Sequence, residues 1–379
     1  MTGPELPRPG LVERVLQRVP LSSPTLLAGP PGAGKTTLLL EAARALADRG
    51  WVPVYLDMMG AASSPERFAV AALDALAAES FGALLGRATQ LRRLAEPGGD
   101  GAAAVRALLS LWSSLGDAGG RPVALLLDEA TEIRSLAYFA GLREVASALG
   151  EALRRRPRGT VLATSYPTQA RALWPGWDVT EVEPLGAAEL ESALSPLGLS
   201  ARAAGVLRAS FGWPRYARVL VERLGQGDDL QTAWAEEMAR GGRLESAARH
   251  TYEALLLRSR GYGMSKAVLA VVAEEEGENL TSLVARLGRS PGAIRDYLGW
   301  LLEVDALRAV KKRYYYVDGM VRAWVRLHGR GRPATAAELR EAARAAVTGE
   351  MAPAAVAPAE EPTEDEPAAP RRDHLMEID

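Results

Sequence analysis

A glycine-rich segment near the N-terminus contains the residue types that bind a polyphosphate. Residues 29–37 read GPPGAGKTT, the pattern GxxxxGK[ST], and they follow an apolar run at 25–28 and precede a helix-forming run at 36–49. Glycines let successive backbone N–H groups turn around an anion, and the helix that follows directs its positive end to the same point. The spacing predicts a phosphate-binding loop, and a chance glycine-rich turn is the alternative.

Two side chains of this loop have specific expected tasks. Lys35 is expected to reach the β- and γ-phosphates, and the Thr36 hydroxyl is expected to hold Mg²⁺. The chain uses arginine for nearly all its positive charge, and lysine occurs only at Lys35, Lys266, Lys311 and Lys312. The residues expected to contact nucleotide here are Gly29, Pro30, Pro31, Gly32, Ala33, Gly34, Lys35, Thr36 and Thr37.

A second motif ends an apolar run further along the chain. Residues 123–129 read VALLLDE, and an apolar run that ends in Asp-Glu is a Walker B pattern. Asp128 is expected to bind the magnesium through water. Glu129 is expected to polarise the attacking water, because a carboxylate can orient a water molecule and take its proton. A helix N-cap is the alternative for Asp128, and the loop upstream favours the catalytic interpretation.

Two further signals lie downstream. Thr164 or Ser165, at the end of another apolar run, is expected to touch the γ-phosphate or the attacking water, and a turn hydroxyl is the alternative. Pro214 and Arg215 belong to a Gly-x-Pro-Arg segment that opens an amphipathic helix. Arg215 could approach the phosphates from a lid, where a guanidinium neutralises charge bidentately. An exposed arginine at a plain helix start is the alternative.

Short apolar runs separated by helix-period segments must position these residues. Alternating strands and helices imply right-handed crossovers and a sheet covered on both faces. Ligands in such sheets bind beyond the carboxyl ends of the strands, where the polar residues above fall. The fold class predicted is α/β: a P-loop NTPase with a five-stranded parallel core, followed by an all-α lid and a winged-helix domain. Strands are expected at 25–28, 52–56, 123–127, 160–163 and 179–182, and helices at 65–79, 136–155, 187–197 and 201–211.

The C-terminal part has helix-turn-helix spacing followed by a hairpin. Gly288-Arg289 forms the expected turn, and Ser290 is expected to cap the second helix of the pair. The segment 308–317 fits a β-hairpin wing. Helices are expected at 264–274, 280–287, 290–302, 318–324 and 334–347.

Charge in this part favours contact with nucleic acid. Residues 281–332 contain eleven Lys or Arg and four acidic residues, a net charge of +7. Basic side chains beside three tyrosines suit phosphate contact with stacking, and a protein-docking or autoinhibitory module is the alternative. The expected nucleic-acid contacts are Arg289, Arg295, Lys311, Lys312 and Arg313.

The last segment has the opposite charge. Residues 348–379 contain nine acidic residues and two arginines, a net charge of −7, and are expected to be disordered. Such a tail could compete with DNA for the basic module or dock a protein. The expected domains are an ATPase core at 1–184, a helical lid at 185–258, a winged helix at 259–332, and a helix with the acidic tail at 333–379.

Composition limits the remaining options. The chain of 379 residues is 48% hydrophobic and 24% charged, as soluble globular proteins are. It has no cysteine, which excludes disulfides and cysteine metal sites, and its three histidines are far apart. No apolar run approaches the roughly 20 residues that a membrane span needs, so a cytoplasmic protein without membrane contact is expected.

The order of these motifs resembles the AAA+/STAND group of P-loop ATPases over about residues 9–328. It is similar to the archaeal-type ATPases of that group, and the lid is similar to those of origin-recognition-type initiators and of the Holliday-junction branch-migration motor. The resemblance implies ATP and Mg²⁺ as cofactors, with Thr164 or Ser165 as sensor 1 and Arg215 as sensor 2. Tyr166 stands where many STAND members carry an arginine, so an arginine from a neighbouring copy, in a homo-oligomer, is a further option. The arginines considered for that role are Arg154, Arg155, Arg156 and Arg171.

The function expected from these features is an ATP-dependent molecular switch or motor. It would bind and hydrolyse ATP with Mg²⁺ and act on double-stranded DNA through the winged helix. The alternative is a nucleotide-controlled signalling or scaffold ATPase whose winged helix docks protein. A small-molecule kinase shares the first motif, but the Asp-Glu strand end and the long helical C-terminal region argue against it.

Overall fold

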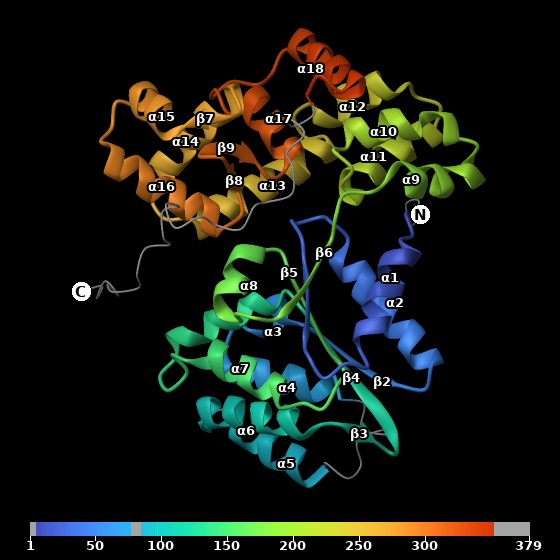
Figure 1. Ribbon diagram of the computed structural model, residues 1–379, viewed down its shortest axis with the longest axis vertical. Coiled ribbons are helices and arrows are strands. Elements are labelled where there is room, and N and C mark those ends of the chain that lie inside the picture. The colour runs from blue at the N-terminus through green and yellow to red at the C-terminus, as the bar shows by residue number, and fades with distance from the viewer. Residues whose placement is uncertain (1–4, 77–84, 97, 352–379) are drawn as a thin grey trace. The chain divides into compact units, whose positions relative to one another are not determined.

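The computed structural model describes residues 5–76, 85–96 and 98–351 (Figure 1). They form two compact units, an N-terminal unit of residues 8–183 and a C-terminal unit of the residues from 184 onward, which also includes residues 5–7. None of the described helices combines the length and apolar composition that a bilayer span requires. The acidic tail from residue 352 onward lies outside the described residues.

Five parallel strands form the centre of the N-terminal unit, as the apolar runs predict. Their order is β2-β4-β5-β1-β6, and a short β3 pairs antiparallel with β4. Leu125, Leu126 and Leu127 are fully buried because helices cover both faces of the sheet. The strands are β1 (Thr25–Ala28), β2 (Val52–Asp57), β3 (Asp117–Ala118), β4 (Arg121–Asp128), β5 (Thr160–Thr164) and β6 (Asp178–Glu181).

Two groups of helices cover this sheet. On one face α1 packs along α2, and α2 contacts β2, β4 and β5 (Figure 1). On the other face lies a core in which Phe68 and Trp112 meet edge to edge, with ring centroids 5.9 Å apart. The helices are α1 (Pro9–Arg18), α2 (Lys35–Asp48), α3 (Met58–Ala61), α4 (Pro65–Asp74), α5 (Leu85–Leu94), α6 (Gly101–Ser114), α7 (Val145–Arg154) and α8 (Pro167–Leu173).

The prediction of one helix over 136–155 is wrong in its first half. The 3₁₀ helix η2 (Ala130–Tyr138) comes first, and α7 begins only at Val145. Gly141 lies between them with a φ of 75°, a left-handed conformation that interrupts a helix. The helix expected at 65–79 ends at Asp74 as α4, and residues 77–79 lie outside the described ones.

Helices form over the segment of the C-terminal unit in which a lid is predicted. Trp234 is buried and its indole N–H donates to the carbonyl of Ala209 at 3.1 Å, which ties α12 to α10. α18, the last helix among the described residues, packs on α10 and α12, and Arg208 Nε donates to the carbonyl of Val347 at 2.7 Å. Residues 336–348 therefore return to helices that lie about a hundred or more positions earlier in the sequence. The helices of this part of the unit are α9 (Ala187–Leu194), η3 (Ser195–Leu197), η4 (Ser200–Arg202), α10 (Ala203–Ala209), α11 (Pro214–Gly225), α12 (Leu230–Met238), α13 (Arg243–Arg258) and α18 (Ala336–Thr348).

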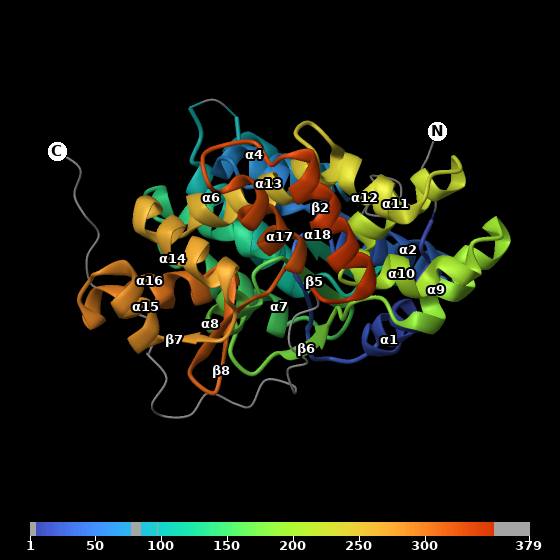
Figure 2. The same ribbon diagram turned by 90° about the horizontal axis from the view of Figure 1, so that it is seen from above.

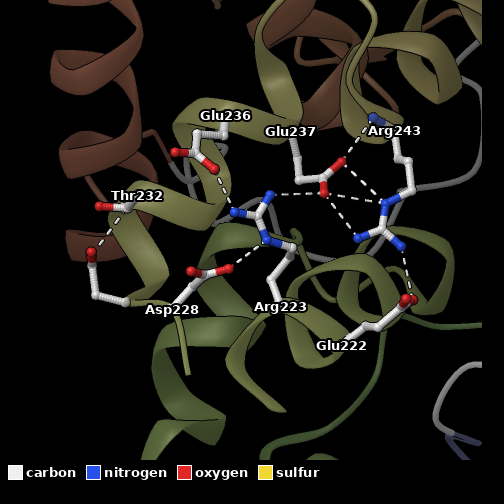
Figure 3. Close-up of polar contacts among 8 residues, drawn as sticks. Glu222, Arg223, Asp228, Thr232, Glu236, Glu237 and Arg243 are labelled. Atoms are coloured by element: carbon white, nitrogen blue, oxygen red, sulfur yellow. Dashed lines mark hydrogen bonds and ion pairs between the residues drawn. The ribbon is translucent and has the colours of Figure 1, made fainter. Parts of the chain in front are cut away.

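An ion-pair network joins three of these helices (Figure 3). Glu237 of α12 accepts from Arg223 of α11 at 3.1 Å and from Arg243 of α13 at 2.9 Å. Arg223 also binds Asp228 and Glu236. Burial by itself would raise the pKa of Glu237, but the hydrogen bonds from Arg243 and Arg223 outweigh burial and lower that pKa to about 2.

This network predicts acid sensitivity of the C-terminal unit. The pKa of Glu237 is lower in the folded state than its ordinary 4.5, so its contribution is complete above about pH 5 and disappears as the pH falls toward 2. We expect Glu237→Gln to lower the unfolding free energy at pH 7 by about 2 kcal/mol and to have much less effect at pH 3. Urea unfolding at both pH values measures this. Glu236→Gln, which changes an exposed member of the same network, is the control, and an equal loss for Glu237→Gln at both pH values would contradict the assignment.

Four more helices and a small three-stranded sheet lie between residues 262 and 328 of the C-terminal unit. Ser290 caps α16 by accepting from the N–H of Ala293 at 3.3 Å, as predicted. The small sheet has the order β7-β9-β8, and its strands lie beside α14 and α16 (Figure 2). The elements are α14 (Tyr262–Glu274), β7 (Glu278–Asn279), α15 (Leu280–Leu287), α16 (Pro291–Glu303), β8 (Leu307–Val310), β9 (Arg313–Tyr316) and α17 (Gly319–His328).

The expectation that three tyrosines beside the hairpin turn would stack on bases is wrong for two of them. Tyr314 and Tyr316 are buried, and the Tyr316 hydroxyl donates to the carbonyl of Leu269 at 2.6 Å. Side chains alternate between the two faces of a strand, so Tyr315 alone of the three is half-exposed.

A buried hydrogen bond connects the lid helices to α17. The Tyr216 hydroxyl of α11 donates to Asp318 Oδ2 at 2.7 Å, while Asp318 Oδ1 caps α17 by accepting from the N–H of Met320. Burial raises the pKa of both Tyr216 and Asp318. The start of α11 and the start of α17 are thus held together within this unit.

Candidate active site

Strand order brings the predicted motifs together. The glycine-rich loop follows β1, the Asp-Glu pair ends β4, and β5 lies between these two strands. All three are parallel, so their carboxyl ends share one edge of the sheet. Residues more than ninety positions apart in the sequence therefore meet at that edge.

The loop after β1 has the backbone that an anion requires. Gly32 and Gly34 have φ values of 84° and 92°, which favour glycine. A side chain at Gly29 would place its Cβ 3.0 Å from the Cβ of Val182. No side chain caps the start of α2, so the first N–H groups of this helix are available to bind phosphate. The flanking loop residues Pro30, Pro31 and Ala33 are partly or fully buried, and Thr36 and Thr37 are exposed.

Lys35 is buried, and its ammonium group has polar partners. Nζ donates to the carbonyls of Gly29 and Pro30 at 2.9 and 3.0 Å and to Ser165 Oγ at 2.8 Å. Glu129 Oε1 lies 3.7 Å away. Burial lowers the pKa of Lys35, and the charges of Glu129 and Asp128 oppose that effect. Phosphate oxygens are well suited to replace these neutral acceptors.

Glu129 has an unusual backbone conformation. Its φ is 46°, in the left-handed region that non-glycine residues rarely occupy. The carboxylate accepts from the backbone N–H of Ser165 at 2.9 Å and also from the Ser165 hydroxyl. The turn after β4 therefore directs this carboxylate toward the end of β5.

The structure distinguishes the two residues that the sequence left open. Thr164 is fully buried, with its hydroxyl 3.1 Å from that of Thr131, and accepts from the N–H of Tyr166 at 3.0 Å. Ser165 lies instead between Lys35 and Glu129. Ser165, the residue directly after β5, is thus the polar residue that faces the candidate site.

Thr36 and Asp128, the two residues predicted to bind magnesium, lie in contact with each other. Thr36 Oγ1 donates to Asp128 Oδ2 at 2.6 Å, and these are the hard oxygen donors that Mg²⁺ prefers. η2 begins without a side-chain cap, so the N-cap alternative for Asp128 is not observed. Tyr55, which the sequence reasoning did not single out, donates its hydroxyl proton to the same Oδ2 at 3.1 Å. Burial, followed by the charge of Asp128, raises the pKa of Tyr55 well above its ordinary value.

Arg215 and Pro214 lie in the C-terminal unit, at the start of α11. Pro214 is buried at the first turn of the helix. Arg215 is half-buried, and its Nη1 donates to Thr251 Oγ1 of α13 at 3.2 Å. This contact belongs to the lid helices themselves.

The four arginines considered for an intermolecular role differ in exposure. Arg156 is buried, which excludes it from reaching another chain. Arg155 pairs with Glu151 of the same helix, Arg154 donates to the carbonyl of Pro175, and Arg171 pairs with Glu181; all three are exposed.

The residues expected to contact nucleic acid lie at two places in the C-terminal unit. Arg289 and Arg295, before and within α16, are exposed. Lys311 and Lys312 form the turn between β8 and β9. Arg313 Nη1 donates to the carbonyl of Gly277 at 2.6 Å, so this side chain also holds β9 near β7.

Comparison with known proteins agrees with this geometry. Residues 10–163 match the family model of the AAA ATPase domain. A Walker-type ATPase of Pyrococcus abyssi has a similar structure, with a TM-score of 0.62 and 16% identity over 84% of this chain and 94% of that chain. At that identity the likeness supports the fold alone.

Two other solved structures are similar at scores too low to support any argument. One is a signal transduction ATPase with numerous domains and a tetratricopeptide repeat sensor from Pyrococcus horikoshii (TM-score 0.36, 14% identity, 86% of this chain and 43% of that chain). The other is the Holliday junction branch migration motor of Thermotoga maritima (TM-score 0.35, 18% identity, 80% and 90%). No curated protein matches the chain. The domain match, the parallel sheet and the loop at its edge agree: the N-terminal unit has the fold of P-loop ATPase domains, and residues 10–163 are similar to the AAA ATPase domain.

Proposed function

We propose that this protein is an ATP-dependent switch or motor that hydrolyses ATP with Mg²⁺ and acts on double-stranded DNA. The observation that supports hydrolysis most directly is the meeting of Lys35, Ser165 and Glu129 within hydrogen-bonding or ion-pair distance at one sheet edge. Charge stabilisation and a positioned water are the main requirements for phosphoryl transfer to water.

Each residue has a task in this proposal. Lys35 exchanges its carbonyl partners for the phosphate oxygens of ATP. Thr36 and Asp128 hold Mg²⁺, which neutralises phosphate charge when bound. Glu129 orients the attacking water and accepts its proton, while Ser165 holds the Glu129 carboxylate in place. Arg215 is proposed to leave Thr251 and approach the phosphates when nucleotide binds.

DNA binding is proposed for α14–α17 with the β8–β9 hairpin, the segment that we propose to be a winged helix. The turn of that hairpin supports it. Lys311 and Lys312 have φ values of 50° and 62°, the pattern of a type I′ turn, which normally prefers Asn-Gly. Left-handed backbone costs a non-glycine residue about 1–2 kcal/mol. Two lysines in this turn lower the stability of the fold relative to Asn-Gly. A role for their positive charges in binding DNA phosphates would explain why lysine stands at these positions.

The double substitution Lys311→Asn with Lys312→Gly separates DNA binding from folding. We expect equal or slightly greater thermal stability, because Asn-Gly suits the turn. The salt dependence of DNA affinity, log K against log salt, should become shallower by about 2, and affinity should fall about ten-fold at low salt. Fluorescence anisotropy with a labelled duplex over several salt concentrations measures both.

Lys266→Asn is the control, because it removes an exposed positive charge from α14. It should change the slope of log K against log salt only a little. An unchanged slope in the double variant, or no duplex binding by the wild type, would favour the scaffold alternative in which this module docks protein. Repeating the titration with a non-hydrolysable ATP analogue tests whether nucleotide changes the affinity, as a switch requires.

A further inference from the structure

Tyr55 is placed to touch the acidic end of the neighbouring strand. It lies opposite Leu126 in the parallel pairing of β2 with β4, two positions before the Asp57–Asp128 pair. Side chains two residues apart project from the same face of a sheet, and an aromatic side chain can span that diagonal. The Tyr55 hydroxyl accordingly reaches Asp128 Oδ2 at 3.1 Å.

Three donors hold the Asp128 carboxylate. Oδ2 accepts from Thr36 Oγ1 at 2.6 Å and from Tyr55, and Oδ1 accepts from the N–H of Glu129 at 3.0 Å. A divalent ion bound here would use an oxygen lone pair of Thr36, and the Thr36 hydroxyl proton could still point to Asp128. Tyr55 would be the second side-chain donor to the same carboxylate oxygen and would help to hold that carboxylate in position as the ion binds.

The surroundings of Asp128 make such a donor useful. Asp57 stands directly opposite Asp128 in the ladder, and Glu129 is the next residue in the chain. Asp57 is turned to cap α3, where it accepts from the N–H of Met59 at 2.9 Å. A neutral hydroxyl beside Asp128 fixes the orientation of its carboxylate without removing the negative charge that attracts a cation.

We propose that Tyr55 is a positioning residue for the magnesium ligand Asp128. This inference rests on the proposed binding of a magnesium nucleotide at the same site. The Tyr55 hydroxyl sets the carboxylate rotamer, and its removal weakens the capture of Mg²⁺ by the protein–nucleotide complex without weakening the contacts of the loop with phosphate.

Tyr55→Phe tests the proposal with a binding readout. A fluorescent ADP analogue is titrated in EDTA, and Mg²⁺ is then titrated into the complex. We expect the affinity in EDTA to stay within about two-fold of wild type and the Mg²⁺ midpoint to rise about ten-fold. Tyr138→Phe, at a residue that is 88% exposed in the same unit, is the matched control and should change neither value.

A double-mutant cycle with Asp128→Asn makes the test specific. Tyr55→Phe should have little further effect on the Mg²⁺ midpoint when Asp128 is already replaced. An unchanged midpoint in the single variant, or equal losses with and without Mg²⁺, would overturn the role of Tyr55. Absence of nucleotide binding by the wild type would instead refute the proposed function, so the two failures are distinguishable.

Discussion

Glu129→Gln is expected to bind ATP with near wild-type affinity and to hydrolyse it about a thousand-fold more slowly, since a general base contributes about 10²–10⁴. The amide oxygen of Gln can still accept from the N–H of Ser165, so the turn after β4 should keep its shape. The amide cannot take a proton from water. Phosphate release measured at saturating ATP, with a separate measurement of nucleotide affinity, distinguishes loss of chemistry from loss of binding.

Two variants make the interpretation specific. Lys35→Ala removes the ammonium group expected on the phosphates and should lose nucleotide binding together with turnover. Glu151→Gln removes an exposed carboxylate of α7, whose side chain is 64% accessible, and should leave both unchanged. Turnover above a tenth of the wild-type rate in Glu129→Gln would assign the base to another group.

Arg156→Met is expected to destabilise the N-terminal unit by about 3 kcal/mol, because it removes several buried hydrogen bonds that one charged group makes. The guanidinium donates to Thr160 Oγ1 and to the carbonyls of Trp112 and Val123 at 3.0, 3.0 and 3.1 Å. Burial lowers the pKa of Arg156 to about 10, so the group remains charged at neutral pH. It ties α6, β4 and β5 together through neutral acceptors.

Arg155→Met is the matched control for this prediction. Arg155 is the preceding residue, its side chain is 68% accessible, and its pair with Glu151 lies on the surface. Such a pair contributes about 0–1 kcal/mol, so little change is expected. Hydrogen exchange of the β4 amides, together with urea unfolding, measures the difference. Equal stability of the two variants would mean that the buried contacts of Arg156 contribute nothing net.

Much of the fold followed from local pattern. The five apolar runs became β1, β2, β4, β5 and β6 with ends shifted by at most a residue or two. The central strands β1, β4 and β5 are buried on both faces, and such strands must be almost continuously apolar. The segment 136–155 was the main failure. Its helical periodicity was real, but a glycine with positive φ and the preceding 3₁₀ helix divided it.

The candidate site shows where sequence reasoning ends. The sequence alone predicts Lys35, Thr36, Asp128 and Glu129 as site residues, because each belongs to a short motif of consecutive residues at the end of a strand. The alternative interpretations were a chance glycine-rich turn and a helix N-cap at Asp128. Both are local structures, so the spacing of nearby residues was enough to compare them with the motifs.

The tertiary structure alone decided which partners complete that site. The choice of Ser165 over Thr164 depends on the position of β5 between β1 and β4, which brings the residue after β5 to Lys35 and Glu129. The contact of Tyr55 with Asp128 depends on the pairing of β2 with β4. The order of strands in a sheet is set by packing between distant segments, and no spacing within one segment encodes it. Burial of Arg156 beside an exposed Arg155 has the same origin, because the chain direction after α7 determines which of two identical side chains enters the core.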